Sequence, residues 1–291
     1  LVSLGIFWFF ASHLITSNVF PLELAFEHRN YFALLGVLLA LVDPIRRIPM
    51  ADSPALKYVA IGAIAVGFGG LAMLRSAVWG DQLHLAMELV ARNADSPRAS
   101  SDLGTIYAGM AGTSGDSPFT AMAEAEFERG SRLPKASPLP EQALILVAAS
   151  QGRPVKDEWW DRFIEKVRTR PIGAQEQMAV AGLLNQRYRG IELDDRRLAQ
   201  ALEALSARTA MPAQMYAQYG DYALTYLHDE ALADEMFVRA INRAPKDAAY
   251  AAQIFSTLTA DGHSRQAKAV FERARVLGLM KGASTSDHRP R

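Results

Sequence analysis

The chain of 291 residues contains no cysteine. This absence excludes a disulfide framework, a thiol nucleophile and a thiolate metal site. An excess of charge is lacking as well, because 31 basic residues balance 31 acidic ones and the formal net charge is zero. A neutral chain without a long run of one sign has no electrostatic reason to bind nucleic acid, so nucleic acid is not an expected partner.

Recognisable catalytic motifs are also missing. The six histidines are scattered, with no pair at the spacing of a helical metal site, and there is no Gly-x-Ser-x-Gly elbow. Asp157–Glu158 and Asp194–Asp195 are adjacent carboxylates. They lie where helices are expected to begin, and carboxylates there cap the helix and offset its dipole. We therefore predict no catalytic residue, no metal site and no cofactor in this chain.

Three long apolar runs lie in the first quarter of the sequence, at residues 1–22, 31–45 and 58–74. An α-helix of about 20 apolar residues crosses the hydrocarbon core of a membrane. The second run is short and contains Asp43 and Pro44, so it suits a buried helix of a soluble core as well as a membrane span. The sequence predicts about three transmembrane helices in residues 1–75. A chain that begins inside an apolar run is expected to be the C-terminal part of a longer protein.

Basic residues between these runs predict the orientation in the membrane. Arg46, Arg47 and Lys57 lie between the second and third runs, whereas the preceding connection contains only Arg29. Because cytoplasmic loops carry the excess of Lys and Arg, residues 46–57 are expected in the cytoplasm. The protein is then expected to be a multi-pass protein of the inner (cytoplasmic) membrane. Everything after residue 75 would be extracytoplasmic, which in a bacterial-type envelope means periplasmic.

The polar residues Glu27, His28 and Arg29 directly precede the second apolar run. In the predicted orientation they lie at the outer mouth of a membrane helix. Two roles remain open for them. In the first, Arg29 pairs with a nearby carboxylate and anchors the helix at the interface; in the second, it contacts the phosphate of a lipid-linked ligand.

The rest of the sequence has the periodicity of helices. From Val78 onward, apolar residues recur at three- and four-residue spacing, and turn sequences interrupt the pattern at short intervals. This pattern predicts about eleven helices of roughly 12 to 17 residues in a domain from 76 to 278. The predicted fold class is therefore all-α. Residues 279–291 are predicted to be a disordered tail.

An internal repeat of 34 residues is present near the C-terminus. Its two copies are Ala233, Phe237, Ala240 and Pro245, and then Ala267, Phe271, Ala274 and Leu279. This spacing resembles the second helix of a tetratricopeptide repeat (TPR), and Leu103-Gly104-x-x-Tyr107 resembles the first helix. Stacked repeats share one continuous core, and such solenoids usually bind proteins. We predict a TPR-like α-solenoid with protein partners, whose repeats between residues 137 and 212 are degenerate.

Aromatic residues in this domain have two possible roles, ligand stacking or core packing. Adjacent positions on a helix point about 100° apart, so Trp159 and Trp160 cannot both face one ligand. Four tyrosines recur at three- and four-residue spacing on one helix face, and they are Tyr216, Tyr219, Tyr222 and Tyr226. For both groups we predict core packing.

The order of these elements resembles a known arrangement. FEHRNYF (residues 26–32) enters a membrane helix, a basic turn and another membrane helix follow, and then come RSAVWGD (75–81) and SPRA (96–99). Over about residues 20 to 130 the chain resembles the C-terminal part of polytopic membrane proteins that fuse a glycosyltransferase-C-like core to extracytoplasmic repeats. The transmembrane-and-TPR O-mannosyltransferase-like family has this arrangement.

In that family the core transfers a sugar from a polyprenyl-phosphate donor to protein hydroxyls, and the catalytic acidic residues lie in early extracytoplasmic loops. The resemblance implies that this chain carries the last membrane helices and the repeat domain but not those loops. Two functions are therefore expected. The first is the partner-binding and anchoring portion of a lipid-linked-sugar glycosyltransferase, and the second is a non-enzymatic scaffold for envelope assembly, unrelated to glycosylation.

Overall fold

A computed structural model of the chain describes residues 1–14, 30–47 and 54–280. Over these ranges every regular element is helical, which confirms the predicted all-α class. The elements are α1 (Val2–Leu14), α2 (Asn30–Arg47), α3 (Pro54–Trp79), α4 (Gln82–Arg92), α5 (Pro97–Ala111), α6 (Pro118–Arg132), α7 (Leu139–Ser150), α8 (Asp157–Thr169), α9 (Ala174–Tyr188), α10 (Asp195–Arg208), α11 (Ala213–Tyr222), a π-helical turn (Ala223–Leu227), α12 (Glu230–Arg243), α13 (Ala248–Ala260) and α14 (Ser264–Val276).

The chain divides into two compact units, Leu1–Ala77 and Val78–Arg291. The predicted domain boundary, between residues 75 and 76, lies two residues before this division.

In the first unit, α1 and α2 form a hairpin with a very close backbone approach. A Cβ atom on Gly36 would lie 2.6 Å from the carbonyl oxygen of Gly5, so only glycine fits at this crossing. The indole Nε1 of Trp8 donates a hydrogen bond to the carbonyl oxygen of Phe32 at 2.9 Å, and the two rings lie 4.8 Å apart. Small residues at a helix crossing allow this kind of packing without a large buried core.

The helix α3 is apolar on all sides. Within the described ranges, Tyr58–Trp79 is the one helical segment that length and composition would allow to cross a membrane, and none of it is buried. Its large side chains are exposed, for example Val66 at 76% and Met73 at 77%. The other two predicted spans are described only in part or contain charges, since α1 ends at Leu14 and α2 includes Asp43. Three spans therefore stay a prediction.

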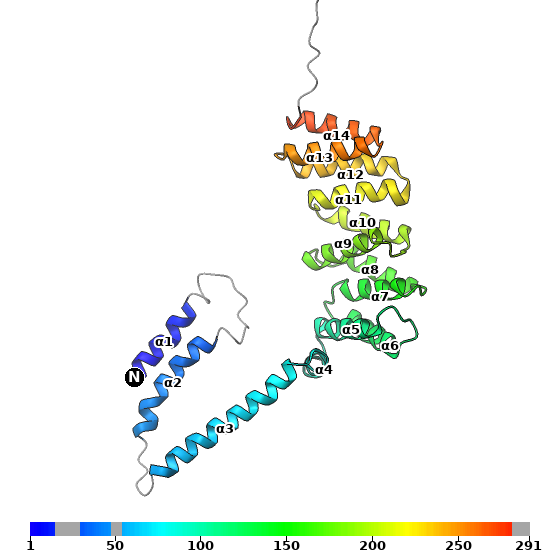
Figure 1. Cartoon of the computed structure of the whole chain (residues 1–291). Helices are drawn as coiled ribbons and strands as arrows, with labels where there is room; N and C mark the ends of the chain where they lie inside the picture. The colour runs from blue at the N-terminus through cyan, green and yellow to red at the C-terminus, as the bar shows by residue number, and fades with distance from the viewer. Residues whose placement is uncertain (15–29, 48–53, 281–291) are drawn as a thin grey trace, which may run out of the picture. The chain divides into compact units, whose positions relative to one another are not determined.

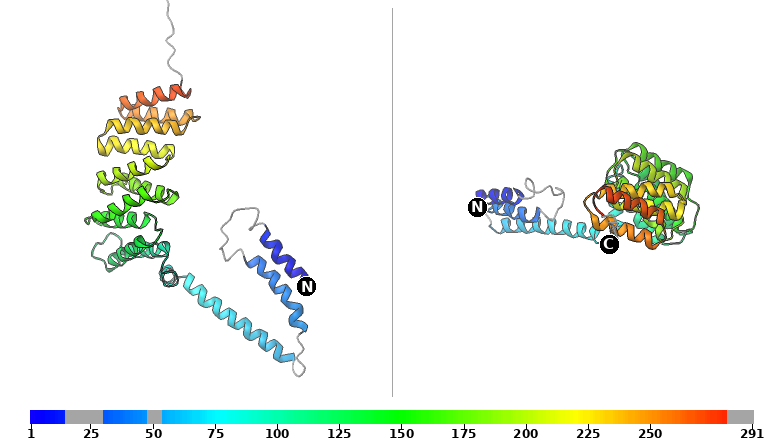
Figure 2. Two further views of the ribbon diagram at one scale, coloured as in Figure 1. Left: turned by 180° about the vertical axis from the view of Figure 1, so that it is seen from behind. Right: turned by 90° about the horizontal axis from the view of Figure 1, so that it is seen from above.

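The second unit contains the eleven helices α4 to α14, each of 10 to 15 residues, and one π-helical turn. The number agrees with the sequence-based expectation, and the helices are slightly shorter than expected. The helices from α5 onward stack one after another in chain order (Figures 1 and 2). Side-chain caps begin several of them; the carboxylate of Asp194, for example, accepts the backbone N–H of Arg197 at 3.0 Å, as predicted.

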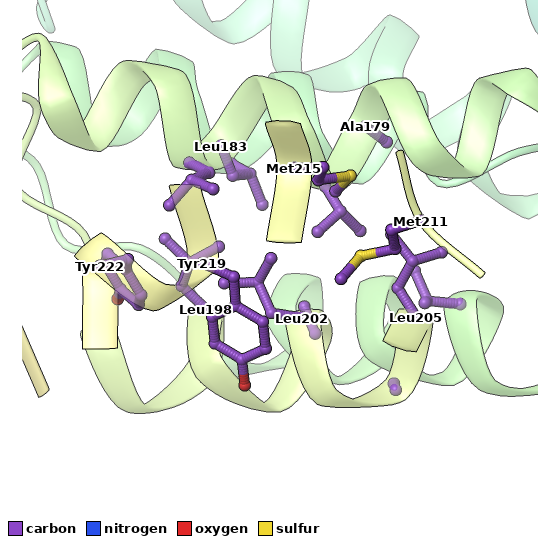
Figure 3. Close-up of a cluster of buried hydrophobic side chains, with 14 of the residues drawn as sticks. Ala179, Leu183, Leu198, Leu202, Leu205, Met211, Met215, Tyr219 and Tyr222 are labelled. Carbon is purple, nitrogen blue, oxygen red and sulfur yellow. The ribbon is translucent and has the colours of Figure 1, made fainter. Parts of the chain in front are cut away.

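One continuous hydrophobic core runs through the second unit. The predicted core role of the two tryptophans is confirmed, because Trp159 and Trp160 are each 1% exposed. Tyr216, Tyr219 and Tyr222 are also buried, whereas Tyr226 is partly exposed. Figure 3 shows the section of the core in which Tyr219 and Tyr222 of α11 lie among leucines of α9 and α10, with Met211 and Met215 in the same cluster.

Most of the repeat-signature residues are buried. Those buried are Leu103, Gly104, Tyr107, Ala233, Phe237, Ala240, Ala267 and Ala274, whereas Phe271 is half-buried and Pro245 is exposed in the turn after α12. A Cβ atom on Gly104 would lie 2.8 Å from the ring of Phe127, and one on Gly220 would lie 3.0 Å from the ring of Phe237. The pairs α5–α6 and α11–α12 thus pack through the same glycine–phenylalanine contact.

The predicted C-terminal tail starts too early. Leu279 and Met280 pack against the hydrophobic core. Gly278, with φ of 72°, reverses the chain after α14, and the N–H of Leu279 reaches the carbonyl of Ala274 at 2.9 Å. This helix-ending motif folds the two apolar side chains back onto the unit. Residues 281–291 lie outside the described ranges.

Candidate functional site

The residues predicted to contact a lipid phosphate or the interface, Glu27, His28 and Arg29, lie outside the described ranges. The second unit contains a groove of about 570 Å³. Its twelve lining residues are Tyr188, Gln214, Ala217, Gln218, Asp221, Phe237, Tyr250, Gln253, Ile254, Thr257, Leu258 and Asp261.

Two helices supply most of the groove because each turns one face toward it. On α11 the lining residues are Gln214, Ala217, Gln218 and Asp221, which have the three- and four-residue spacing of a single face. On α13 a face with the same spacing runs from Tyr250 to Asp261. Phe237 of α12 lies against Gly220, so the core contact between α11 and α12 also fixes the inner wall of the groove.

At one side of the groove, hydrogen bonds fix the positions of two polar side chains. The hydroxyl of Tyr188 donates to a carboxylate oxygen of Asp221 at 2.7 Å and lies 3.1 Å from the carbonyl oxygen of Gln218. Burial and the hydrogen bond with Asp221 raise the pKa of Tyr188, so its phenol remains a proton donor at neutral pH. Tyr188 therefore fixes the carboxylate of Asp221 in one orientation.

A partly buried network of polar and aromatic side chains lies next to Tyr188. Arg187 donates two hydrogen bonds to the carboxylate of Asp195, at 2.9 and 3.0 Å, and its guanidinium lies 4.1 Å from the ring centre of Tyr226. The hydroxyl of Tyr222 donates to the same carboxylate at 2.7 Å. The ring of Tyr226 packs edge-on against Tyr188 at 5.7 Å. The π-helical turn that carries Tyr226 thereby links α9, α10 and α11 beside the groove.

The hydroxyl of Tyr250 on the opposite wall is different. It is buried, and it has no hydrogen-bond partner within the part of the chain that the structure describes. Burial, and to a smaller extent Asp247, raise the pKa of this phenol as well. Leaving a buried hydroxyl unpaired costs free energy. Tyr250 lines the groove, but its hydroxyl oxygen is inaccessible to solvent.

The most deeply buried charges lie elsewhere and have a structural role. Lys166 of α8 contacts a carboxylate oxygen of Glu141 at 2.6 Å and the carbonyl oxygens of Ser131 and Ser137 at 2.9 and 3.2 Å. Glu141 is fully buried and also accepts a hydrogen bond from the Ser131 hydroxyl. Every partner of Lys166 belongs to this packing, so the cluster ties α6, α7 and α8 together.

The groove offers hydrogen-bonding groups, apolar contacts and two carboxylates. Its polar groups are glutamine amides, a threonine hydroxyl, two phenols and two carboxylates. In the described ranges no group of three His, Asp or Glu side chains has the arrangement of a metal site. A lining of this composition suits a ligand that itself has many donors and acceptors.

Sequence reasoning did not identify this groove. Gln214 and Gln218 are four residues apart, which is the spacing of one helix face, and this was the available signal. Tyr188 carried no signal, because it comes 26 residues before Gln214 in the sequence. A comparison with protein-family models, curated proteins and solved structures found no match to this chain.

Proposed function

We propose that this chain is a membrane-anchored, TPR-like repeat protein that binds protein partners in the groove between α11 and α13. The observation that carries the proposal is the groove itself, which lies on a stack of helix pairs and is lined by amides, phenols and carboxylates. Stacked helical repeats present extended surfaces of this kind to other proteins.

The TPR-like assignment is supported by packing as well as by spacing. The glycine–phenylalanine contacts in α5–α6 and α11–α12 are equivalent, and the 34-residue shift takes Phe237 to Phe271 in α14. Phe271 in turn packs beside Phe255 of α13, with ring centres 5.7 Å apart. Each of these three helix pairs thus has a phenylalanine of its second helix packed against its first helix.

Anchoring in the membrane is supported by the exposed apolar side chains of the first unit. In water these surfaces would be costly, at about 25 cal/mol for each Å². In lipid, α3 has the length and composition of a span, and the glycine crossing of α1 and α2 suits helices that pack in a bilayer. Arg46, Arg47 and Lys57 favour a cytoplasmic position for residues 46–57. The second unit, with its groove, is then extracytoplasmic, in an inner membrane protein with about three spans.

The resemblance to membrane glycosyltransferases with TPR domains supports a more specific form of the proposal. In that form the full protein uses a polyprenyl-phosphate sugar, the groove holds the protein acceptor, and Arg29 contacts the donor phosphate. In the alternative form the chain is an envelope assembly scaffold. Arg29→Ala separates the two forms: weaker binding of polyprenyl phosphate in micelles, with unchanged helicity, supports the first form, and unchanged binding contradicts it.

The groove is tested by filling it. Ala217 is a small, half-buried groove residue on α11, and Ala217→Trp places an indole in the space that a partner would occupy. A photoreactive amino acid at Gln253 should form an adduct with a partner protein in native membranes, and Ala217→Trp should remove that adduct. The matched control is the same probe at Lys268, which is exposed on α14 and does not line the groove. Identical adducts from both positions, or an adduct that survives Ala217→Trp, would contradict the proposal.

A further inference from the structure

The groove carries charge of only one sign. Of its twelve lining residues, Asp221 and Asp261 are acidic and none is basic. Within the described ranges neither carboxylate forms a salt bridge, although most buried or half-buried carboxylates of this unit do, including Glu124, Glu141 and Asp195. The groove therefore has an uncompensated negative potential.

The position of Asp261 strengthens that potential. Asp261 is the C-cap residue of α13, and the C-terminus of a helix carries the negative end of its dipole. A carboxylate there is unfavourable for the isolated protein. The same carboxylate becomes favourable when a cation lies beside it, because the helix end and the side chain then attract the same charge.

The apolar part of the groove fits the rest of a basic side chain. Ala217, Phe237, Ile254 and Leu258 supply an apolar floor, and the rings of Tyr188 and Tyr250 stand in the walls. Lysine and arginine combine a long apolar stem with a charged head, so they can bury the stem on such a floor and place the head near a carboxylate. The aromatic rings also attract a cation that lies over their faces.

The amide side chains of three glutamines favour a peptide as the molecule that carries this basic side chain. Gln214, Gln218 and Gln253 each offer an amide donor and an amide acceptor. An extended peptide has unpaired backbone N–H and C=O groups along its length, and amide side chains can pair with both.

We propose that the groove binds an extended segment of a partner protein that carries a lysine or arginine, with its charged head held by Asp221 and Asp261. This inference rests on the proposed function, since it names the chemistry of the segment that the groove binds. Tyr188 is a positioning residue in this site, because its hydroxyl orients Asp221 and leaves the second carboxylate oxygen for the ligand.

The inference is tested with random ten-residue peptides displayed on phage and selected on the full chain in lipid nanodiscs, against empty nanodiscs. The selected peptides should share a lysine or arginine. Their binding should weaken about tenfold when Asp221→Asn and Asp261→Asn are combined, as expected for the loss of two partly exposed ion pairs, and it should weaken at high salt. The control combines Asp102→Asn with Glu158→Gln, two exposed carboxylates outside the groove, and should change binding less than twofold.

Two results would overturn the inference. The first is that the peptides selected by the groove have no basic residue; the second is that the double Asp→Asn variant binds them as tightly as the parent chain does. In either case Ala217→Trp separates the inference from the proposed function. If Ala217→Trp still blocks the peptides, the groove is a binding site for a different segment. If it does not block them, the groove itself is not the binding site.

Discussion

The ion pair between Glu141 and Lys166 should hold three helices in register, and its removal should show how the second unit is stabilised. Lys166→Met keeps the apolar stem but removes the ammonium group. It leaves the buried carboxylate of Glu141 with Arg162 as its remaining cation, at 3.7 Å, and two backbone carbonyls lose a donor. Removing one partner of a buried pair typically costs about 3–5 kcal/mol. Because Ser131 continues to donate to Glu141, we expect a value near the lower end.

Lys166→Met, a second single variant and the double variant together form a double-mutant cycle. The second single variant is Glu141→Leu, which leaves the Lys166 charge without a carboxylate and should lower the free energy of unfolding by a similar amount. The double variant removes both charges, so no unpaired charge remains in the core. Its expected cost is about 1–2 kcal/mol, from the hydrogen bonds lost by the serine groups. The two single effects should therefore exceed the double effect by several kcal/mol, which is the coupling energy of the pair.

Urea unfolding of the full chain in detergent micelles measures these differences. The fluorescence of the buried Trp159 and Trp160 reports on the second unit, where the indole of Trp159 is hydrogen-bonded to Glu128. The control is Arg239→Met, which breaks an exposed pair with Glu235 and should leave the free energy of unfolding within about 0.5 kcal/mol of the parent. Single variants whose effects simply add in the double variant would refute the coupling, and a loss below about 1 kcal/mol for Lys166→Met would refute the role of the pair.

Three further variants test other parts of the structure. Gly104→Ala should destabilise the second unit by about 1–3 kcal/mol, because the added methyl group clashes with Phe127. The control is Gly109→Ala on the same helix, which meets open space and should be neutral or stabilising. Equal effects of the two variants in urea unfolding would contradict the close packing at Gly104. Asp195→Asn should lower stability at pH 7. Burial opposes ionisation of the Asp195 carboxyl, but hydrogen bonds from Arg187 and Tyr222 outweigh it and hold the pKa below its ordinary value of 3.8. The ionised carboxylate therefore stabilises the parent fully above pH 3.8. This stabilisation is lost as the pH falls through the lower pKa of the folded state. Thermal unfolding followed by circular dichroism should therefore show a difference between parent and variant that shrinks at acidic pH, and a constant difference would contradict this role. Val66→Arg places a charge in the middle of the exposed α3 and should lower the membrane insertion of a test segment that comprises residues 54–79, whereas Ala77→Arg near the end of the helix should not. Equal insertion of both variants would contradict a span through α3.

The helices were predictable because their signals are local. These signals are periodic apolar residues, capping side chains such as Asp194, and the spacing of small and aromatic residues within each copy of the repeat. Each of them involves residues within a few helical turns of one another. The tail was misjudged for the opposite reason. Leu279 and Met280 are packed by a reversal at Gly278 onto a core that lies elsewhere, and nothing in their immediate sequence indicates that contact.

The groove was not predictable because stacking creates it. Gln218 and Gln253 belong to two separate helices, and they line one groove only because α11 packs on α12, α12 on α14 and α14 on α13. The contact between Tyr188 and Asp221 joins residues 33 positions apart. By contrast, the contact between Gly220 and Phe237 beside the groove could have been found, since Gly220 follows an aromatic residue and precedes a phenylalanine by 17 residues, and Gly104 precedes Phe127 by 23.

The central claim is that an extracytoplasmic groove is occupied by a partner protein, and the absence of cysteine gives a direct measurement of it. One variant has a single cysteine at Thr257, inside the groove, and the other has a single cysteine at Lys268, outside it. Both are labelled with a membrane-impermeant maleimide. Labelling is measured first in cells with a permeable outer envelope and an intact inner membrane, and then in the purified protein. We predict rapid labelling at position 268 in cells, slow labelling at position 257 in cells, and equally rapid labelling of both in the purified protein. Labelling of both positions only after lysis would contradict the extracytoplasmic orientation, and equal rates at both positions in cells would contradict an occupied groove.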